Sequence, residues 1–304
     1  MEGILPLWKP KGMTSHDCVF KLRKILRMKK IGHTGTLDPD VTGVLPICLG
    51  RATKVAEYIT DAGKSYEGEV TIGYSTTTED SSGDKVEEKV VTGSITREQV
   101  EEVLRSLTGV IKQTPPMFSA VKVNGKRLYE YARQGIEVER PTREVTIYKI
   151  ELLDECESLS GEQVSFRFKV DCSKGTYIRT LAVMIGEKLG YPAHMSDLSR
   201  TRSATMTLSD CLTFEQIEEA QSKGLLEQSL RPIEDALSYL PKYEINDTLA
   251  MRVRNGAVLE APPELLQTEG PIAVFTESGE AIAIYVHHPS KQGMIKPSKI
   301  LKVL

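Results

Sequence analysis

A glycine-rich turn, GHTGTLDPDVTG at residues 32–43, carries the first residue type that suggests chemistry, an acidic side chain next to a basic segment. Asp38 precedes a proline near the middle of this turn. Gly32, Gly35 and Gly43 allow the backbone to turn sharply and a ligand to approach it closely. An aspartate before proline is often only a turn residue. Its neighbours here make Asp38 the first candidate for a catalytic carboxylate.

A second candidate, Arg179, lies where an expected strand gives way to an expected helix. The segment CSKGTYIRT, residues 172–180, follows the alternating VSFRFKV and precedes the apolar LAVMIGEKLG. A cation at the start of a helix opposes the helix dipole unless an anion neutralises it. A surface arginine is the simpler interpretation of Arg179, and a buried partner such as Asp38 would overturn it.

Two further stretches place cations or a phenol beside flexible backbone. Lys9 and Lys11 flank a proline and precede Gly12, which suits a phosphate contact and equally suits a solvated turn. Lys64 precedes Tyr66 at the start of an expected strand. A core or edge tyrosine is the ordinary interpretation of Tyr66.

The glycine-rich turn also fits a different chemistry. Asp38, Asp40 and Thr42 form D-x-D-x-T, the pattern of haloacid-dehalogenase-like phosphotransferases, in which the first aspartate is the nucleophile and magnesium neutralises the phosphate. That motif follows a buried strand, whereas residues 29–36 are polar and rich in glycine. The sequence therefore disfavours a phosphotransferase.

Composition indicates a globular protein with locally basic surfaces. The chain has 304 residues, of which 40% are hydrophobic, enough for about two domains. Its formal net charge is −3, yet residues 1–60 hold ten Lys and Arg against five Asp and Glu, and residues 112–149 hold eight against four. Such stretches are compatible with a positive face that attracts phosphates. Charge counts alone favour two ordinary solvated faces.

Cysteines and histidines indicate neither a disulfide framework nor a metal site. The five cysteines are scattered without a CxxC pair, and only His287 and His288 are close, on opposite faces of a strand. The N-terminus lacks a signal-peptide pattern, and no apolar run is long enough for a membrane span. We expect a cytoplasmic protein that uses no metal and no cofactor.

Hydrophobic spacing predicts two helices with clear N-terminal signals. The first begins at Ser15 with Thr14 or Ser15 as its N-cap. The second follows a capping box that starts at Thr96, and Gly109 suits its C-cap. Basic residues crowd the outer side and the C-terminal end of the first helix, namely Lys21, Arg23, Lys24, Arg27, Lys29 and Lys30.

Alternating patterns predict strands over residues 66–74 and 164–170, and Asn124-Gly125 indicates a type I′ hairpin. Because no regular βαβ alternation is present, the fold class is α+β. After residue 240 the pattern changes to a helix from Asp247 to Asn255, closed by Gly256, and short strands at 272–275, 281–286 and 300–303. We expect two domains, residues 1–240 and a small β-rich module at 241–304.

Five of these stretches together resemble one family. They are WKPKGMTSHD, GHTGTLDPDVTGVLPICLGRATK, KSYEGEV, PPMFSAVKVNGKRLYEYARQG and CSKGTYIRTL. In the same order they are similar to the motifs of the bacterial tRNA pseudouridine synthases of the TruB type, over residues 8 to about 182. The tail from about 241 resembles a PUA-type RNA-binding module in its position and β-rich composition.

The resemblance implies a fold, an activity and a partner. The fold is a mixed, mostly antiparallel sheet of the pseudouridine synthase type with a small PUA-like domain, and an insertion at about 112–140 closes over the RNA. The activity is conversion of uridine 55 in the T arm of tRNA to pseudouridine. The partner is tRNA, bound through its T stem-loop. We expect a monomer with no membrane contact and no obligate protein partner.

The resemblance also implies roles for single residues. Asp38 matches the catalytic aspartate, and Arg179 matches the arginine that pairs with it, with Tyr177 beside it. Tyr66 matches the tyrosine that packs on the base and is proposed to take the C5 proton. His33 matches the histidine that helps to fill the space left by the flipped base.

Other residues in or after these motifs are expected to contact the substrate. Lys9, Lys11 and Lys64 belong to the matching segments. Leu198 follows the CSKGTYIRTL segment together with His194 and Arg202, and we expect all three near the site.

The implied reaction agrees with a site built on one carboxylate. The glycosidic bond from C1′ to N1 must break, the uracil must turn, and a bond from C1′ to C5 must form, with no net redox change. A carboxylate stabilises the cation-like sugar, whether Asp38 attacks C1′, attacks C6 or promotes elimination. The base must also leave its stack. The remaining alternative is a non-catalytic RNA-binding or folding-assistant protein, for which Asp38 is dispensable.

Overall fold

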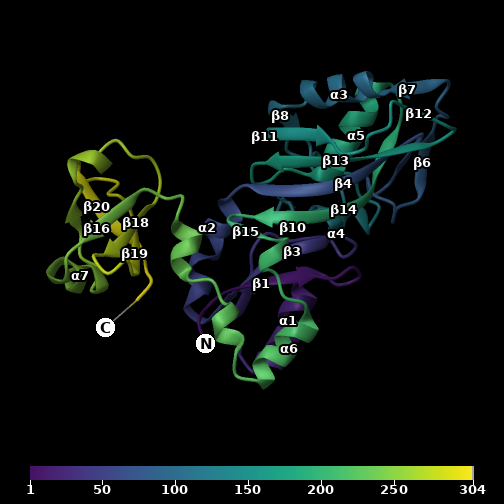
Figure 1. Cartoon of the computed structure of the whole chain (residues 1–304). Helices are drawn as coiled ribbons and strands as arrows, with labels where there is room; N and C mark the ends of the chain where they lie inside the picture. The colour runs from purple at the N-terminus through teal and green to yellow at the C-terminus, as the bar shows by residue number, and fades with distance from the viewer. Residues whose placement is uncertain (303–304) are drawn as a thin grey trace.

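A nine-stranded sheet forms the centre of the molecule in the computed structural model, which describes residues 1–302 (Figure 1). The main strand order is β1-β3-β14-β4-β13-β11-β8, with β2 beside β3 and β15 beside β14. Their bounds are β1 (Gly3–Lys9), β2 (Ile31–His33), β3 (Thr42–Leu49), β4 (Lys64–Ile72), β8 (Gly109–Gln113), β11 (Arg143–Leu152), β13 (Val164–Cys172), β14 (Ala193–Ser203) and β15 (Met206–Thr207). Within this sheet, as far as residues 1–302 describe it, only β3 and β14 pair in parallel. The expected mixed, mostly antiparallel α+β sheet is confirmed.

Helices complete the core on this sheet. The largest hydrophobic cluster joins the strands to α1 (Ser15–Leu26), α3 (Arg97–Ser106), α5 (Ile178–Leu189) and α6 (Phe214–Ser222). The first two begin with the expected capping boxes at Thr14 and Thr96. The end of α3 differs from the expectation, because Leu107 is its C-cap. Gly109, with φ +100°, instead starts the edge strand β8, where the chain turns out of the helix.

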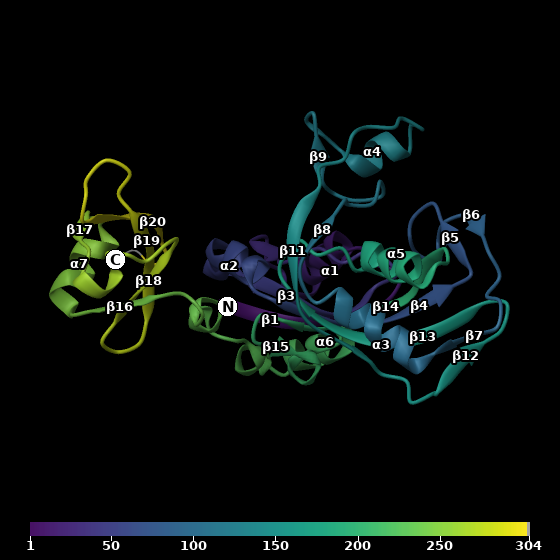
Figure 2. The ribbon, with the colours of Figure 1, turned by 90° about the horizontal axis from the view of Figure 1, so that it is seen from above.

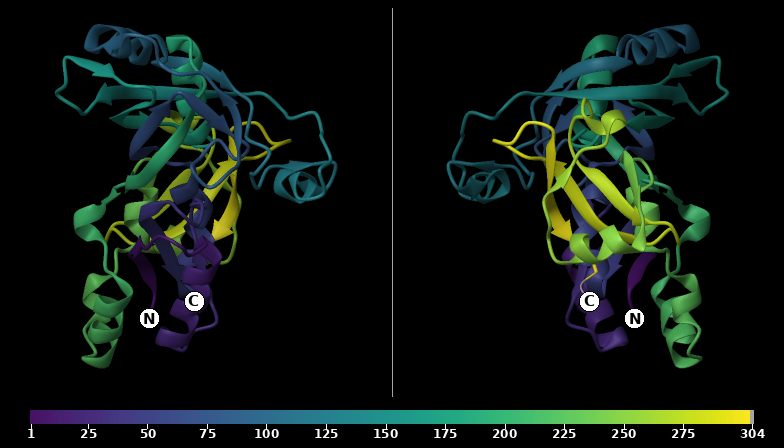
Figure 3. Two further views of the ribbon diagram at one scale, coloured as in Figure 1. Left: turned by 90° about the vertical axis from the view of Figure 1, so that its right-hand side faces the viewer. Right: turned by 90° about the vertical axis from the view of Figure 1, so that its left-hand side faces the viewer.

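The expected strand over 164–170 is confirmed as part of β13, and the one over 66–74 is confirmed as far as Ile72, where β4 ends before Gly73. The two strands pair over their whole length. The hairpin at Asn124-Gly125 is confirmed as well, with φ +50° and +83° between β9 (Lys122–Val123) and β10 (Lys126–Arg127). It leads into the short helix α4 (Leu128–Ala132). This insertion stands out from the sheet in Figure 2 and in both views of Figure 3.

Smaller elements border the main sheet. Two ribbons pair β5 (Tyr74–Thr76) with β6 (Lys85–Glu88) and β7 (Ser94–Thr96) with β12 (Ser158–Ser160). The remaining helical turns are η1 (Gly50–Val55), α2 (Ala56–Asp61), η2 (Leu208–Asp210), η3 (Leu226–Ser229), η4 (Ile233–Leu237) and η5 (Pro263–Leu265). No helix among residues 1–302 has the length and apolar character that a membrane crossing requires.

A second sheet follows residue 241, with the order β16-β18-β19-β20-β17. Its elements are β16 (Lys242–Ile245), α7 (Asp247–Arg254), β17 (Leu259–Glu260), β18 (Ile272–Thr276), β19 (Ala281–His287) and β20 (Met294–Ile300). The last strand lies earlier than the expected 300–303, and position 303 is outside the described residues. Pro297 obscured the strand in the sequence. It is tolerated because the edge strand β17 pairs only with Met294 and Ile295, so β20 needs no donor at Pro297.

The two sheets share a hydrophobic cluster. Ile4 and Val44 of the main sheet belong to the same buried group as Phe275 and Ile284 of the second sheet. Across the junction, Lys54 Nζ donates to the carbonyl of Ile300 at 2.7 Å, and Lys299 Nζ donates to the carbonyl of Lys54 at 2.8 Å. The second sheet is therefore packed against the first as well as tethered to it.

Candidate active site

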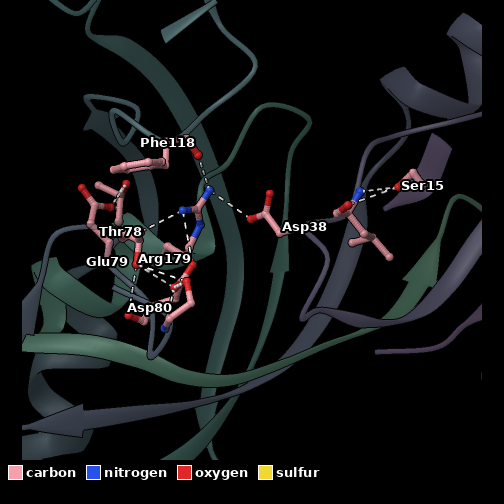
Figure 4. A network of polar contacts seen from close by, with 10 residues as sticks. Ser15, Asp38, Thr78, Glu79, Asp80, Phe118 and Arg179 are labelled. Carbon is pink, nitrogen blue, oxygen red and sulfur yellow. Dashed lines mark hydrogen bonds and ion pairs between the residues drawn. The ribbon is translucent and has the colours of Figure 1, made fainter. Parts of the chain in front are cut away.

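Asp38 and Arg179 form an ion pair at the centre of the site, with 3.0 Å between Oδ2 and Nη2 (Figure 4). Asp38 lies in the loop between β2 and β3, and Arg179 lies in the first turn of α5. The Arg179 side chain is only 8% exposed, whereas that of Asp38 is 44% exposed. The arginine is thus a buried support, while the carboxylate keeps an open side.

Three more groups fix the Arg179 guanidinium. Its Nη1 donates to the carbonyl of Thr78 at 2.8 Å and lies 3.4 Å from the carboxylate of Asp80, and its Nη2 donates to the carbonyl of Phe118 at 2.9 Å. Thr78 and Asp80 follow β5, and Phe118 belongs to the insertion. Because a planar guanidinium accepts partners only along its N–H directions, these contacts determine how it presents itself to Asp38.

Two side chains from elsewhere in the chain hold the backbone of the Asp38 loop. Ser15 Oγ accepts a hydrogen bond from the amide of Leu37 at 2.9 Å and donates to its carbonyl at 3.2 Å. Arg200, which is fully buried, donates from Nε to Val44 O at 2.7 Å and from Nη2 to Gly35 O at 3.0 Å. The loop is therefore anchored in its middle and on both sides of Asp38.

Two glycines permit this close packing. Gly35 has φ +67° and Gly43 has φ +111°. A Cβ at Gly43 would lie 2.2 Å from the carbonyl oxygen of Arg200, where β3 and β14 pair in parallel. The glycines were expected to admit a ligand, and at Gly43 the group that approaches is the protein's own backbone.

The structure gives Lys9 a different place from the expected phosphate contact. It is fully buried, and its ammonium donates to three carbonyls, those of Pro10 and Pro39, both at 2.9 Å, and that of Val41 at 2.7 Å. Burial lowers the pKa of Lys9. Lys9 is the last residue of β1, and its side chain points into the protein. Through Pro39 and Val41 it supports the backbone of the Asp38 loop.

Lys64 also turns its ammonium away from solvent. Nζ donates to the carbonyls of Thr60 at 2.8 Å and Ala62 at 3.0 Å, at the end of α2. Burial lowers the pKa of Lys64 to about 8. The side chain still lines a cavity beside Tyr66. Lys11, by contrast, is exposed and lines the other cavity that reaches Asp38.

Two cavities meet at the ion pair. One, of about 570 Å³, is bordered by Lys11, Phe118 and Arg133. The other, of about 720 Å³, is bordered by Tyr66 and Tyr177. Asp38, Arg179 and Leu198 line both. Volumes of this size suit small-molecule groups such as a nucleoside. Leu198 therefore lies near Asp38, and Phe118 and Arg133 of the insertion border the smaller cavity.

The two tyrosines of the larger cavity are neutral phenols at neutral pH. Tyr66 projects from β4 and is 8% exposed, and burial raises its pKa, although Arg200 opposes the shift. Burial also raises the pKa of Tyr177, the N-cap of α5. Its backbone is held by Gln113, which accepts from the amide at 2.9 Å and donates to the carbonyl at 3.2 Å.

Besides Lys9, three expected residues line neither cavity. His33 ends β2 at the start of the Asp38 loop, and its Nδ1 is buried without a hydrogen-bond partner within residues 1–302. His194 is buried against Tyr74, with 4.3 Å between ring centroids. Arg202 donates from Nε to Ser65 Oγ at 2.8 Å. Burial lowers the pKa of His33, so its ring is neutral at neutral pH.

The electrostatics of Asp38 combine opposing influences. Burial raises the pKa of its carboxyl, the Arg179 guanidinium lowers it, and the Asp80 carboxylate raises it again. A carboxylate of raised pKa is a better base and nucleophile than an ordinary aspartate, and Arg179 keeps it oriented. Within residues 1–302, no three His, Cys, Asp or Glu side chains gather as a metal site would require.

Sequence reasoning missed Thr78, Asp80, Phe118, Ser15 and Arg200. Asp80 belongs to an acidic run that looks like a solvated turn, and Ser15 had been considered only as a helix cap. Nothing local to either residue indicates a partner far along the chain. Arg200 lies in the polar run SDLSRTRS, residues 196–203, where the sequence gives no sign that its side chain is buried.

Comparison with known proteins gives two consecutive family matches. Residues 23–178 match the family described as "TruB family pseudouridylate synthase (N terminal domain)". Residues 179–238 match the one described as "tRNA pseudouridylate synthase B C-terminal domain". Together they cover residues 23–238, which hold every strand of the main sheet except β1.

Curated relatives are similar over the whole chain. A protein of Geobacillus thermodenitrificans named tRNA pseudouridine synthase B is 61% identical over 302 residues, 99% of this chain and 100% of that protein. One of Bacillus cereus with the same name is 61% identical over 99% of this chain and 97% of its own length.

Solved structures are similar in fold. A Cbf5-Nop10-Gar1 complex contains a chain 30% identical to this one, with a TM-score of 0.74 over 99% of this chain and 85% of that one. An H/ACA RNP bound to a substrate RNA containing 2′-deoxyuridine contains a chain 26% identical, with a TM-score of 0.73 over the same shares.

Proposed function

This chain belongs to the TruB family of pseudouridylate synthases, and on that premise we propose that it converts uridine 55 in the T arm of tRNA to pseudouridine. One observation carries the proposal, the half-exposed carboxylate of Asp38 held by a buried arginine where two cavities meet. A reaction that detaches and rejoins a base needs such a carboxylate and room for the base to turn.

Asp38 acts first on the ribose or on the base. The bond from C1′ to N1 breaks, and the carboxylate stabilises the electron-poor sugar either by bonding to it or by its charge, as in glycoside chemistry. Arg179 keeps the second oxygen of Asp38 occupied, so that the first faces the substrate. N1 takes the electron pair of the broken bond, the uracil turns, and C5 forms its bond to C1′. C5 then gives its proton to a base and N1 gains a proton, so that the composition of the nucleoside is unchanged.

Tyr66 packs on the detached uracil and prevents its escape. Because burial raises the pKa of its phenol, Tyr66 is protonated when the substrate arrives. It takes up the C5 proton only if it passes its own proton to another acceptor. Tyr177 and Leu198 form further walls of the space in which the base turns.

His33 has a role in flipping the base rather than in the reaction. It stands at the start of the Asp38 loop and outside both cavities. That position suits a side chain that fills the stack from which the uridine has left, and so offsets part of an unstacking cost of a few kcal/mol.

Other parts of the molecule hold the RNA. Lys11 and the insertion, through Phe118 and Arg133, border the cavity of Asp38 and are suited to close over the bound strand. We assign residues 1–240 to the catalytic domain and 241–304 to a PUA-like RNA-binding domain. Strands β16–β20, which pair only with one another in the described part of the chain, support that division.

The enzyme acts as a monomer on tRNA, without cofactor or obligate protein partner, in the cytoplasm where tRNA is matured. A phosphotransferase requires the motif directly after a buried strand, whereas Asp38 lies inside a loop, well beyond the three-residue β2. A binding protein without activity would have no use for an arginine buried beneath Asp38.

The test uses a tRNA transcript tritiated at uridine C5, incubated in the presence of chelator with the wild-type protein and with Asp38→Asn. Tritium release by the wild type, and none by the variant despite intact tRNA binding, is the expected result. If neither protein releases tritium but both bind, the protein is a binding protein for this RNA. Release that stops with chelator would instead support metal-dependent chemistry.

A further inference from the structure

The outer face of α1 and the turn after it carry five exposed cations, here called the α1 cations. They are Arg23, Lys24, Arg27, Lys29 and Lys30. None of them forms an ion pair with a carboxylate among residues 1–302. On two other helices the cations are paired, since Arg97 and Arg105 of α3 share Glu101 and Lys223 of α6 pairs with Glu219. Lys188 in the last turn of α5 is a single cation with no ion pair among residues 1–302.

This arrangement opposes folding. Arg23 and Lys24 lie in the last turn of α1, and Arg27 is its C-cap, so three like charges gather within five residues. Like charges this close together repel one another. One or two cations are sufficient to complement the negative end of the helix dipole. The remaining charge therefore has a purpose outside the fold.

The position of α1 connects these cations to the active site. Ser15, the first residue of the helix, binds the Asp38 loop through Leu37. A helix of 12 residues is about 18 Å long, so the α1 cations lie beyond the two cavities but close enough for a bound RNA to continue over them. None of the five lines either cavity.

An exposed aromatic ring lies among these charges. Phe20 is 54% exposed, and Lys24 Nζ stands 4.6 Å from its ring centroid. A phenylalanine with a cation over it, in contact with solvent, is a combination that proteins use beside nucleic-acid backbones and bases. An acidic protein partner would be attracted by the cations but would have no bases to stack on the Phe20 ring.

We propose that the α1 cations bind the phosphate backbone of tRNA at a second place, outside the cavities that receive the flipped nucleotide. This proposal rests on the function proposed above, because it takes tRNA as the ligand. The contact supplies affinity and orientation rather than chemistry. The contact does not distinguish one nucleotide sequence from another, because phosphates are the same along every strand.

The test compares the triple variant Lys24→Gln, Arg27→Gln, Lys30→Gln with wild type. Arg23 is left in place because its Nη2 donates to the carbonyl of Ile31 at 3.1 Å and so supports β2. Binding of a tRNA transcript is measured by fluorescence anisotropy from low to high salt. Loss of three phosphate contacts lowers the slope of log Kd against log salt by about two to three and weakens binding at least tenfold at low salt.

The matched control removes the same charge from other helices through Arg105→Gln, Lys188→Gln and Lys223→Gln, all exposed. It is expected to keep the wild-type salt slope. Equal slopes for the α1 variant and wild type, or an equal loss for the control, would overturn the proposal. Circular dichroism verifies that α1 remains folded in the variant.

An isolated T-arm hairpin locates the contact. A loss for whole tRNA that exceeds the loss for the hairpin places the α1 cations on another part of the tRNA, and equal losses place them on the T stem. Both results support the proposal. Because these are binding measurements, they remain decisive even if tritium assays show that the wild type forms no pseudouridine.

Discussion

Ser15 and Leu37 form a two-way contact in which one hydroxyl accepts from the amide of Leu37 at 2.9 Å and donates to its carbonyl at 3.2 Å. The residue that starts α1 thus fixes the backbone immediately before Asp38. Arg200 and Lys9 hold the same loop at other points. The position of the Asp38 carboxylate therefore depends on side chains that hold the backbone of its loop.

Ser15→Ala is expected to slow the reaction while leaving tRNA affinity near wild type. The amide of Leu37 would lose its buried partner, which costs about 1–3 kcal/mol, and Asp38 would lose its fixed orientation. A misplaced reactive group lowers kcat by roughly ten- to a hundredfold. Single-turnover tritium release and anisotropy separate the two quantities. Ser106→Ala, on the exposed side of α3, is the control, and an equal effect there would contradict the positioning role.

Asp80→Asn is expected to move the acid limb of the pH profile to lower pH. The Asp80 carboxylate raises the pKa of Asp38, so removing its charge allows Asp38 to stay ionised in more acidic solution. The measurement is the single-turnover rate as a function of pH. Asp84→Asn removes an exposed carboxylate from the same turn and is expected to leave the limb in place. If Asp80→Asn moved the acid limb to higher pH, repulsion between the Asp80 and Asp38 carboxylates would not be what raises the pKa of Asp38.

Asp38→Asn is expected to be inactive yet at least as stable as wild type at neutral pH. Because burial raises the pKa of Asp38, the folded protein binds that proton more tightly than the unfolded chain does. Ionisation of Asp38 therefore lowers the free energy of unfolding. This destabilisation is absent below the ordinary aspartate pKa and is complete once the pH has risen through the raised pKa of the folded protein. Urea unfolding at neutral and acidic pH tests this. A variant clearly less stable at neutral pH would mean that attraction to Arg179 exceeds the cost of burial.

The sequence predicted candidate residues of this site from local physics. A cation at the start of α5 and an acid in a glycine-rich turn made Arg179 and Asp38 candidates, but local physics favoured a surface arginine, and only the family resemblance implied that the two residues pair. Asp80 and Ser15 could not be predicted, because their contacts depend on how distant segments pack. The alternating pattern located β4 and β13, whereas Pro297 concealed the position of β20.

The sequence also could not tell that Lys9 is buried whereas Lys11 is exposed. A matched pair of variants distinguishes their roles. Lys9→Met leaves three carbonyls without this donor, of which that of Val41 is buried, and we expect a loss of stability of about 1–3 kcal/mol. Lys11→Met removes an exposed cation at the cavity, and we expect weaker tRNA binding with unchanged stability. Urea unfolding and anisotropy on both variants decide the matter. Equal stability of the two variants would contradict the structural role of Lys9.

Gly43→Ala tests whether the close approach of β3 and β14 positions the site. A Cβ at this residue would lie 2.2 Å from the carbonyl oxygen and 2.8 Å from the amide nitrogen of Arg200, and neither backbone atom has room to withdraw from a central pair of strands. We expect Gly43→Ala to fold poorly or to separate the Asp38 loop from Arg200. Gly12→Ala is the control, because Gly12 also has positive φ, at +83°, but no atom lies within 4 Å of its added Cβ. The backbone conformation alone costs roughly 1 kcal/mol, so Gly12→Ala is expected to fold and react. Equal behaviour of the two variants in thermal unfolding and tritium release would show that conformation, rather than contact with β14, is what Gly43 provides.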